Sequence, residues 1–247
     1  MTTPAPSALR GVDAVLFDLD GVLTPTAEVH MRAWSRLFTP YLDARGVDPY
    51  TDEDYFAHID GRPRYEGVRT LLSSRGITLD EGEPSDSAEA ETICGLGNRK
   101  NAEFSAVLEA EGVTPYPGSV RLVDSLIARG VAVAVVSSSK NAPAVLRAAG
   151  IDDRFEVVID GAVAAELGLP GKPEPDTFSY AAKQLGVPDE KSVVIEDAVS
   201  GVRAGAAGSF ASTVGVDRGV GAQTLLDAGA DLVVTDLAEL LDEEAQA

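Results

Sequence analysis

The chain has 247 residues, of which 45% are hydrophobic, and this is enough for one large domain or for a core with a smaller insert. The 40 acidic residues exceed the 20 basic ones, so the formal net charge is -20, which disfavours nucleic acids and anionic membranes as partners. Cys94 is the only cysteine, which excludes an intramolecular disulfide and a zinc cluster built on cysteines.

Residues 1–11 lack the basic start and the apolar stretch of a signal peptide. The longest apolar run, Val131–Val136, is too short to span a bilayer, so we expect a cytoplasmic protein. The negative charge would also repel an anionic metabolite at long range. Any phosphate site must therefore gather its own lysine, arginine or metal ion.

The first predicted element is a buried parallel strand at Ala14–Phe17, a short run of strand formers followed at once by the turn-like residues 18–21. After Thr26 the apolar residues take helical spacing, and the chain stays mostly helical and polar as far as about Gly112. This stretch predicts an all-helical insert. Within it, the acidic segment Asp80–Glu91 predicts a solvated loop.

Residues 114–118 break the helical pattern and predict a return to the first domain. Strands then alternate with helices, which predicts an α/β fold with a parallel sheet covered on both faces. The core is expected at 1–26 and 115–247, and the insert at 27–114. The predicted strands are 131–136, 157–159, 192–195, 211–214 and 232–234, and the predicted helices are 119–128, 142–149, 176–185 and 202–206.

In an open parallel sheet the ligand lies beyond the carboxyl ends of the strands, so the residues at those ends are candidates for a site. Asp18 and Asp20 follow the first predicted strand, and Ser137 follows the second. Glu196 and Asp197 follow the strand at 192–195. A turn at 171–176 adds Lys172 and opens the next helix. Carboxylates, a hydroxyl and one lysine are thus predicted to converge on one edge.

This set suits phosphoryl transfer to an aspartate, which needs a cation between two anions and donors for the phosphoryl oxygens. Asp18, Glu196 and Asp197 offer the hard oxygen ligands that Mg²⁺ prefers. Ser137 and Lys172 offer donors, and Asp20 can act as general acid and base. Each residue also has an ordinary interpretation as a helix cap, a turn or a loop, and only the order and placement together favour the site.

Four segments in this order resemble the motifs of the haloacid dehalogenase superfamily, and within it the beta-phosphoglucomutase-like group. They are FDLDGVL at 17–23, VSS at 136–138, KP at 172–173 and VIED at 194–197. The resemblance implies a Rossmann-like core with a small all-helical cap. It also implies that Asp18 forms an aspartyl-phosphate, that Asp20 is the acid and base, and that Ser137 and Lys172 bind the transferring phosphoryl group. The implied Mg²⁺ ligands are Asp18, the backbone carbonyl of Asp20, and Asp197 with Glu196 close by.

The resemblance extends to residues that would contact the rest of the substrate. Two of these residues also have an ordinary interpretation, His30 as a side chain packed on a helix face and Arg64 as a surface charge. His58 and Arg62 are given only the ordinary interpretation. Pro25 stands where the group usually has an aspartate, which predicts a stiffer first linker between core and cap. The implied substrate residues are Thr26, His30, Arg64, Lys100, Asn101, Ser139, Lys140 and Asn141.

The function implied by the resemblance is Mg²⁺-dependent conversion of beta-glucose 1-phosphate to glucose 6-phosphate through a bisphosphate. A phosphatase on the same sugar phosphates is the alternative, and a non-catalytic sugar-phosphate sensor is a remote one. A haloacid dehalogenase would need neither Asp20 nor the acidic pair Glu196 and Asp197, so it is disfavoured. We expect a monomer whose partner is a small sugar phosphate, and neither nucleic acid nor a membrane.

Overall fold

A computed structural model describes residues 9–241, which belong to two compact units. The core unit comprises Met1–Pro25 and Thr114–Ala247, and the helical unit comprises Thr26–Val113. Both division points lie one residue before those expected from the sequence. No helix within the described range is both long enough and apolar enough to cross a membrane.

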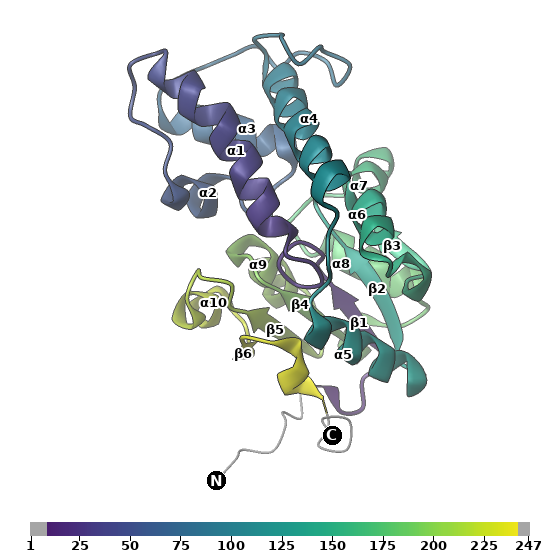
Figure 1. The fold of residues 1–247 in the computed structure, drawn as a ribbon. Coiled ribbons are helices and arrows are strands. Elements are labelled where there is room, and N and C mark those ends of the chain that lie inside the picture. Colours follow the sequence, from purple (N-terminus) through teal and green to yellow (C-terminus); the bar gives the residue numbers. More distant parts are fainter. Residues whose placement is uncertain (1–8, 242–247) are drawn as a thin grey trace. The chain divides into compact units, whose positions relative to one another are not determined.

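The core unit is built on a six-stranded parallel sheet in the order β3-β2-β1-β4-β5-β6 (Figure 1). The two central strands, β1 and β4, are buried along their whole length, which agrees with the apolar runs AVLF in β1 and VVI in β4. The predicted α/β class with a parallel sheet is therefore confirmed. The strands are β1 (Ala14–Phe17), β2 (Ala132–Val136), β3 (Val157–Ile159), β4 (Ser192–Glu196), β5 (Ser212–Val216) and β6 (Leu232–Val234).

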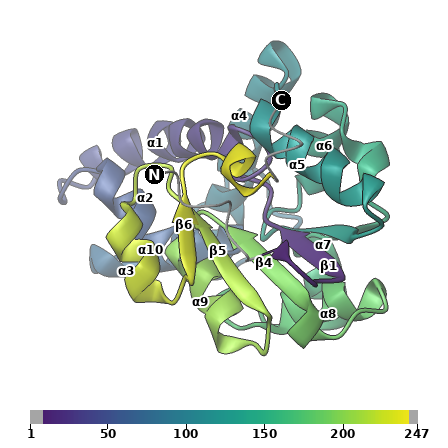
Figure 2. The ribbon, with the colours of Figure 1, turned by 90° about the horizontal axis from the view of Figure 1, so that it is seen from below.

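Helices cover both faces of this sheet (Figures 1 and 2). One face carries α5 (Pro117–Ala128) and α6 (Ala142–Ala149). The other carries α8 (Asp176–Gln184), α9 (Val199–Ala207) and α10 (Ala222–Ala228). The strand order runs outward from β1 in both directions, so right-handed crossovers place the two sets of helices on opposite faces.

Two core helices were not predicted: α7 (Gly161–Leu167) and α10. Each has only seven residues, too few to show a helical period, and α7 contains no buried residue. The start of α9 was predicted three residues too late, because Ser200 and Gly201 look like turn residues. The core unit also contains the short 3-10 helices η2 (Asp152–Arg154), η3 (Asp189–Lys191) and η4 (Leu237–Leu240).

The helical unit contains α1 (Thr26–Asp43), α2 (Asp52–His58), α3 (Arg64–Ser74) and α4 (Ile93–Glu111). Apolar residues from all four helices pack into one buried cluster, which includes Phe38, Tyr55, Leu71 and Leu96. The predicted loop at Asp80–Glu91 joins α3 to α4 and contains neither helix nor strand, as expected.

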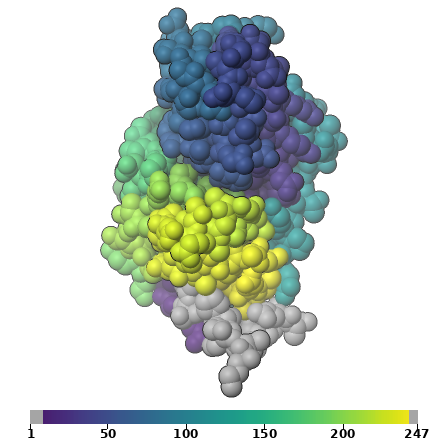
Figure 3. Space-filling model, turned by 90° about the vertical axis from the view of Figure 1, so that its left-hand side faces the viewer, coloured from purple at the N-terminus to yellow at the C-terminus, as the bar shows by residue number. Residues whose placement is uncertain are grey.

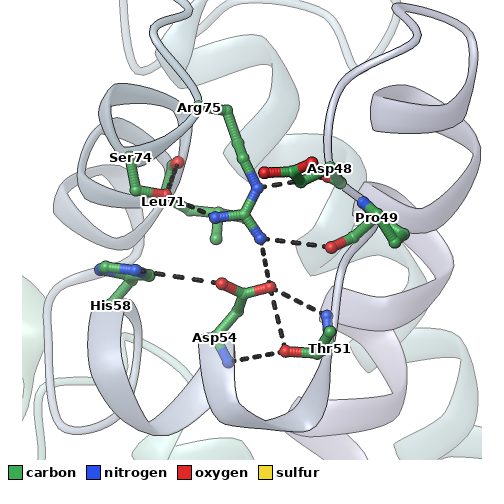
Figure 4. Close-up of polar contacts among 8 residues, drawn as sticks. All are labelled: Asp48, Pro49, Thr51, Asp54, His58, Leu71, Ser74 and Arg75. Atoms are coloured by element: carbon green, nitrogen blue, oxygen red, sulfur yellow. Dashed lines mark hydrogen bonds and ion pairs between the residues drawn. The ribbon is translucent and has the colours of Figure 1, made fainter.

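A network around Asp54 and Arg75 ties α2 to the end of α3 (Figure 4). Asp54 closes a capping box with Thr51 at the start of α2 and accepts a hydrogen bond from Arg75 Nη2 at 2.5 Å. Arg75 also donates to the carbonyl oxygens of Asp48 and Pro49, both at 3.2 Å. Burial acts to raise the pKa of Asp54, but the hydrogen bonds from Arg75 and Thr51 outweigh it and lower that pKa.

We expect Arg75→Met to lower the free energy of unfolding by about 2 kcal/mol at pH 7, since it removes charged hydrogen bonds from a mostly buried carboxylate. A carboxyl with a lowered folded pKa contributes stability above its unfolded pKa and loses it as the pH falls through the folded value. The gap between wild type and variant should therefore narrow below about pH 4. Urea unfolding of both proteins at pH 7 and pH 3.5 measures this difference in the free energy of unfolding.

Arg69→Met is the matched control, because Arg69 pairs with Glu81 in the same unit but both side chains are about half exposed. It should change the free energy of unfolding by at most about 0.5 kcal/mol. Equal losses in the two variants would show that the Asp54 network does not stabilise this unit.

Candidate active site

Three strands of the core sheet end side by side at the candidate site. Phe17 of β1 is in register with Ile195 of β4 and Val135 of β2, so the residues that follow emerge at one level of the edge. The backbone N–H of Asp18 still donates to the carbonyl oxygen of Ile195 at 2.9 Å. Sheet pairing therefore fixes the main chain of Asp18 up to the point where its side chain leaves the strand.

Lys172 comes from the loop before α8 and lies buried between two carboxylates. Its Nζ donates to Asp18 Oδ1 at 2.5 Å, to Glu196 Oε1 at 2.6 Å and to the carbonyl oxygen of Val136 at 3.0 Å. Burial alone would lower the pKa of Lys172, but the negative charges of Asp18 and Glu196 outweigh it and raise that pKa. The ammonium is therefore held protonated beside Asp18.

Asp18 has a pKa well above that of an ordinary aspartate, because burial disfavours its charge more than Lys172 favours it. Glu196 and Asp20 add to the rise by like-charge repulsion. A bound divalent cation would act in the opposite direction and favour the ionised carboxylate. Without a cation, the charged form of the Asp18 carboxyl is therefore disfavoured.

Asp18, Glu196 and Asp197 form a cluster that fits a cation, since one carboxylate oxygen from each lies within 4.8 Å of the others. All three are buried, and a hard oxygen set of this kind suits Mg²⁺. Glycine makes the close approach possible at Gly201, where a Cβ atom would lie 1.8 Å from Glu196 Oε1. Glu196 Oε2 in turn accepts a hydrogen bond from the N–H of Ala198 at 2.8 Å, which orients the carboxylate.

Asp20 lies in a tight turn directly after the strand end. The N–H of Gly21 donates to the carbonyl oxygen of Thr24 at 2.7 Å, and Thr24 donates back to the carbonyl oxygen of Leu19. Asp20 Oδ2 lies 3.5 Å from Ser137 Oγ, which links the turn to the end of β2. The structure therefore brings the predicted residues Asp18, Asp20, Ser137, Lys172, Glu196 and Asp197 to one edge of the sheet.

Ser139, Lys140 and Asn141 continue along the loop from β2 to α6. Ser137 Oγ accepts from the N–H of Ser139 at 3.1 Å, and Ser139 Oγ accepts from the N–H of Asn141 at 3.2 Å. These hydrogen bonds shape the loop before α6, whose N-cap residue is Asn141 and has no side-chain cap. Lys140 is exposed at the surface of the core unit.

Among the predicted substrate residues of the helical unit, Lys100 is buried and its Nζ contacts His30 Nδ1. Lys100 Nζ lies 5.0 Å from the ring centroids of both Trp34 and Phe104, and the His30 ring stacks on Phe104. His30 and Lys100 are thus a packed pair, which the sequence did not reveal. Thr26 is buried at the start of α1, and Asn101 lies half-buried on α4.

Arg64 begins α3, and its guanidinium lies 5.1 Å from the ring centroid of Tyr65. Its Nε is buried, and within residues 9–241 no hydrogen-bond acceptor reaches it. Arg62 pairs with Glu66 at 2.8 Å, and His58 lies 3.9 Å from Asp54, so both have local partners.

The core unit is a parallel α/β sheet with carboxylates and one buried lysine gathered at the carboxyl ends of its strands. This is the place where α/β enzymes of this architecture bind their ligands. The family model of haloacid dehalogenase-like hydrolases matches residues 12–208. The chain therefore belongs to the haloacid dehalogenase-like hydrolase family, and the resemblance given by the four sequence motifs is confirmed.

Individual relatives and solved structures give a more specific comparison than the family model. The chain is 47% identical to a beta-phosphoglucomutase of Mycobacterium bovis over 242 residues, which cover 93% of this chain and 92% of the relative. A crystal structure of a beta-phosphoglucomutase from Clostridium difficile superposes with a TM-score of 0.76 at 28% identity, covering 95% and 96% of the two chains. CbbY from Rhodobacter sphaeroides, solved as a mutant in complex with xylulose-(1,5)bisphosphate, gives a TM-score of 0.71 at 26% identity, covering 95% and 99%. The chain is thus an enzyme of the phosphotransferase or phosphatase type.

Proposed function

We propose that the chain transfers the phosphoryl group of a small sugar phosphate through an aspartyl-phosphate on Asp18, with Mg²⁺ as the cofactor. The observation that supports this most directly is the placement of a buried ammonium, Lys172 Nζ, 2.5 Å from Asp18 Oδ1 and 2.6 Å from Glu196 Oε1. Such an ammonium can hold phosphoryl oxygens beside the nucleophile. The three clustered carboxylates supply the oxygen set for the metal ion.

In the first step, a carboxylate oxygen of Asp18 attacks phosphorus while the bond from phosphorus to the ester oxygen breaks. Asp20 gives its proton to the departing oxygen, and Lys172 and Ser137 donate hydrogen bonds to the transferring group. Asp18, Glu196, Asp197 and the carbonyl oxygen of Asp20 would hold Mg²⁺, whose charge would reduce the repulsion between the phosphate and the Asp18 carboxylate. In the second step Asp20 takes a proton from the acceptor hydroxyl, which attacks phosphorus and frees Asp18.

The acceptor decides between two reactions. A sugar hydroxyl gives a mutase acting through a bisphosphate, and water gives a phosphatase. We favour the mutase that converts beta-glucose 1-phosphate to glucose 6-phosphate, because a relative at 47% identity bears the name beta-phosphoglucomutase. The bisphosphate in the CbbY complex is a ligand with two anionic ends. Thr26, His30, Arg64, Lys100, Asn101, Ser139, Lys140 and Asn141 are proposed to bind the sugar and its second phosphate, with the helical unit acting as a cap.

The two reactions are separated by supplying beta-glucose 1-phosphate with Mg²⁺ and a trace of the bisphosphate, then measuring glucose 6-phosphate and free phosphate in the same samples. We expect glucose 6-phosphate to form far faster than free phosphate. Release of free phosphate alone would eliminate the mutase, and absence of turnover on a panel of sugar phosphates would favour a sensor.

Removal of Mg²⁺ tests the carboxylate cluster without any substrate. A ligand at about 100 times its Kd stabilises the folded state by about 2.7 kcal/mol. We therefore expect Mg²⁺ to raise the melting temperature by several degrees, and a chelator to reverse this. Asp197→Asn should lose most of the rise, whereas Asp153→Asn, at a highly exposed surface residue, should keep it. An equal Mg²⁺ response in both variants would contradict the proposed site.

A further inference from the structure

The turn that carries Asp20 is held from outside by contacts to three consecutive carbonyl groups. Arg218 Nε donates to the carbonyl oxygen of Gly21 at 2.6 Å. Ser119 Oγ donates to that of Val22 at 2.7 Å, and the N–H of Tyr116 donates to that of Leu23 at 2.9 Å. Two of these donors come from the start of α5, and Arg218 donates to the carbonyl of Gly21, the residue directly after Asp20.

Arg218 uses its guanidinium to join three segments of the core unit. Besides Gly21, it donates through Nη1 to the carbonyl oxygen of Thr235, just after β6, at 2.9 Å. Its Cζ also lies 3.9 Å from the ring centroid of Tyr116, in a cation–π contact with the start of α5. A planar guanidinium can make these contacts at once, and a lysine ammonium cannot.

The loop that supplies Arg218 is itself well fixed. The N–H of Asp217 continues the sheet pairing by donating to the carbonyl oxygen of Val234 at 2.8 Å. Asp217 Oδ1 accepts from the N–H groups of Gly219 at 2.9 Å and Gly221 at 3.0 Å. The polypeptide that follows β5 forms the yellow-green to yellow surface of the core unit in Figure 3. Arg218 therefore extends from an anchored loop.

Gly21 is confined on its other side by Asp197. A Cβ atom on Gly21 would lie 1.8 Å from Asp197 Oδ2, and the backbone has φ of +88°, which favours glycine. Gly21, the residue after Asp20, thus lies between a carboxylate of the proposed metal site and the Arg218 guanidinium. A glycine in this position can change its backbone angles at little cost, so a fixed conformation has to come from such contacts.

We infer that Arg218 is a positioning residue that holds the Asp20 turn in the geometry required for proton transfer. The catalytic part of this inference rests on the proposed function, in which Asp20 is the general acid. A general acid acts only when it lies within hydrogen-bond reach of the leaving oxygen, so a looser turn lowers the rate of the chemical step. The proposed function gives the carbonyls of Gly21, Val22 and Leu23 no contact with the sugar phosphate, so we expect the effect to fall on kcat.

The first experiment compares two substrates in wild type and Arg218→Met. For a sugar phosphate we expect kcat to fall about 10- to 100-fold, with KM changed by less than about threefold. For p-nitrophenyl phosphate, release of p-nitrophenol in a single turnover reports the first step alone, and its rate should fall much less because this leaving group needs little protonation. Arg218→Lys should recover only part of the loss. Equal losses on both substrates would overturn the role of Arg218 in positioning the acid.

The second experiment needs no turnover. Hydrogen exchange of the peptide covering residues 19–24 should become at least tenfold faster in Arg218→Met, whereas exchange in the strands of the sheet should stay as in wild type. Arg154→Met is the matched control, because Arg154 is likewise an arginine of the core unit that donates to a backbone carbonyl, here that of Gly150 after α6, and it pairs with Asp124 on α5. It should leave exchange at 19–24 and both activities unchanged.

A uniform rise of exchange across the core unit would overturn the inference, since it would show a general loss of stability and no local role. Unchanged exchange at 19–24 would overturn it as well. If the wild type turned over no phosphate ester, the proposed function would fail, and the exchange comparison would still decide whether Arg218 holds the turn.

Discussion

Asp18→Asn is expected to reduce turnover of phosphate esters by at least about 10³-fold, which corresponds to about 4 kcal/mol in activation free energy. An amide oxygen is a poor nucleophile, so the covalent step through the side chain is lost. The same change should lower stability little, because Lys172 keeps Glu196 as its anionic partner. Burial already makes the charged form of Asp18 costly, as its raised pKa shows, and a neutral amide of equal size removes that cost.

Turnover is measured with sugar phosphates under saturating Mg²⁺, and stability by urea unfolding with the metal removed. Asp13→Asn is the matched control, because Asp13 directly precedes β1 and is exposed. It should retain wild-type turnover. Unchanged turnover in Asp18→Asn would refute the aspartyl-phosphate mechanism, and a large loss of stability would show that the site is built for stability as well as chemistry.

The parts of the site that could be predicted are those fixed by the sheet. Asp18, Ser137 and Glu196 each lie at the end of a short apolar run, and parallel pairing brings such ends to one edge whatever the surrounding loops do. Their convergence therefore followed from strand prediction alone. The same holds for the fold class, since only the alternation of strands and helices was needed.

The remaining contacts depend on loop geometry and on long-range packing, which carry no periodic signal. Nothing in the residues around Lys172 indicates that its ammonium bridges Asp18 and Glu196. Arg218 was missed for the same reason, because it lies in a glycine-rich loop and its partner Gly21 is 197 residues away in sequence. The sequence did indicate a tight turn at Gly21, because an aspartate followed directly by a glycine is typical of such a turn.

Lys172→Met should have the largest effect on stability. The substitution removes the ammonium from between Asp18 and Glu196 and leaves two buried carboxylates whose oxygens lie within 4.8 Å of one another. Loss of one partner from a buried ion pair costs about 3–5 kcal/mol, a large fraction of the total of about 5–15 kcal/mol that holds a domain folded. Turnover should also be lost, because no donor would hold the transferring phosphoryl group beside Asp18.

The pH dependence of the free energy of unfolding distinguishes loss of the Lys172 charge from a simple packing defect. Asp18 already has a raised pKa, and without Lys172 that pKa rises further. A carboxyl with a folded pKa above its unfolded value binds extra protons in the native state, so its contribution to stability is present at low pH and is lost as the pH rises through the folded pKa. The deficit of Lys172→Met relative to wild type should thus shrink from pH 7 to pH 5.

Urea unfolding at the two pH values, with and without Mg²⁺, measures this deficit. Mg²⁺ should recover part of the stability of Lys172→Met, because a divalent cation replaces some of the missing positive charge among the carboxylates. Lys191→Met is the matched control, since Lys191 is exposed and its Nζ donates only at 3.3 Å to the carbonyl oxygen of Gly11. A deficit that did not change with pH or Mg²⁺ would mean that the lost contribution of Lys172 is packing of its aliphatic chain, and that the charge balance of the cluster does not govern the site.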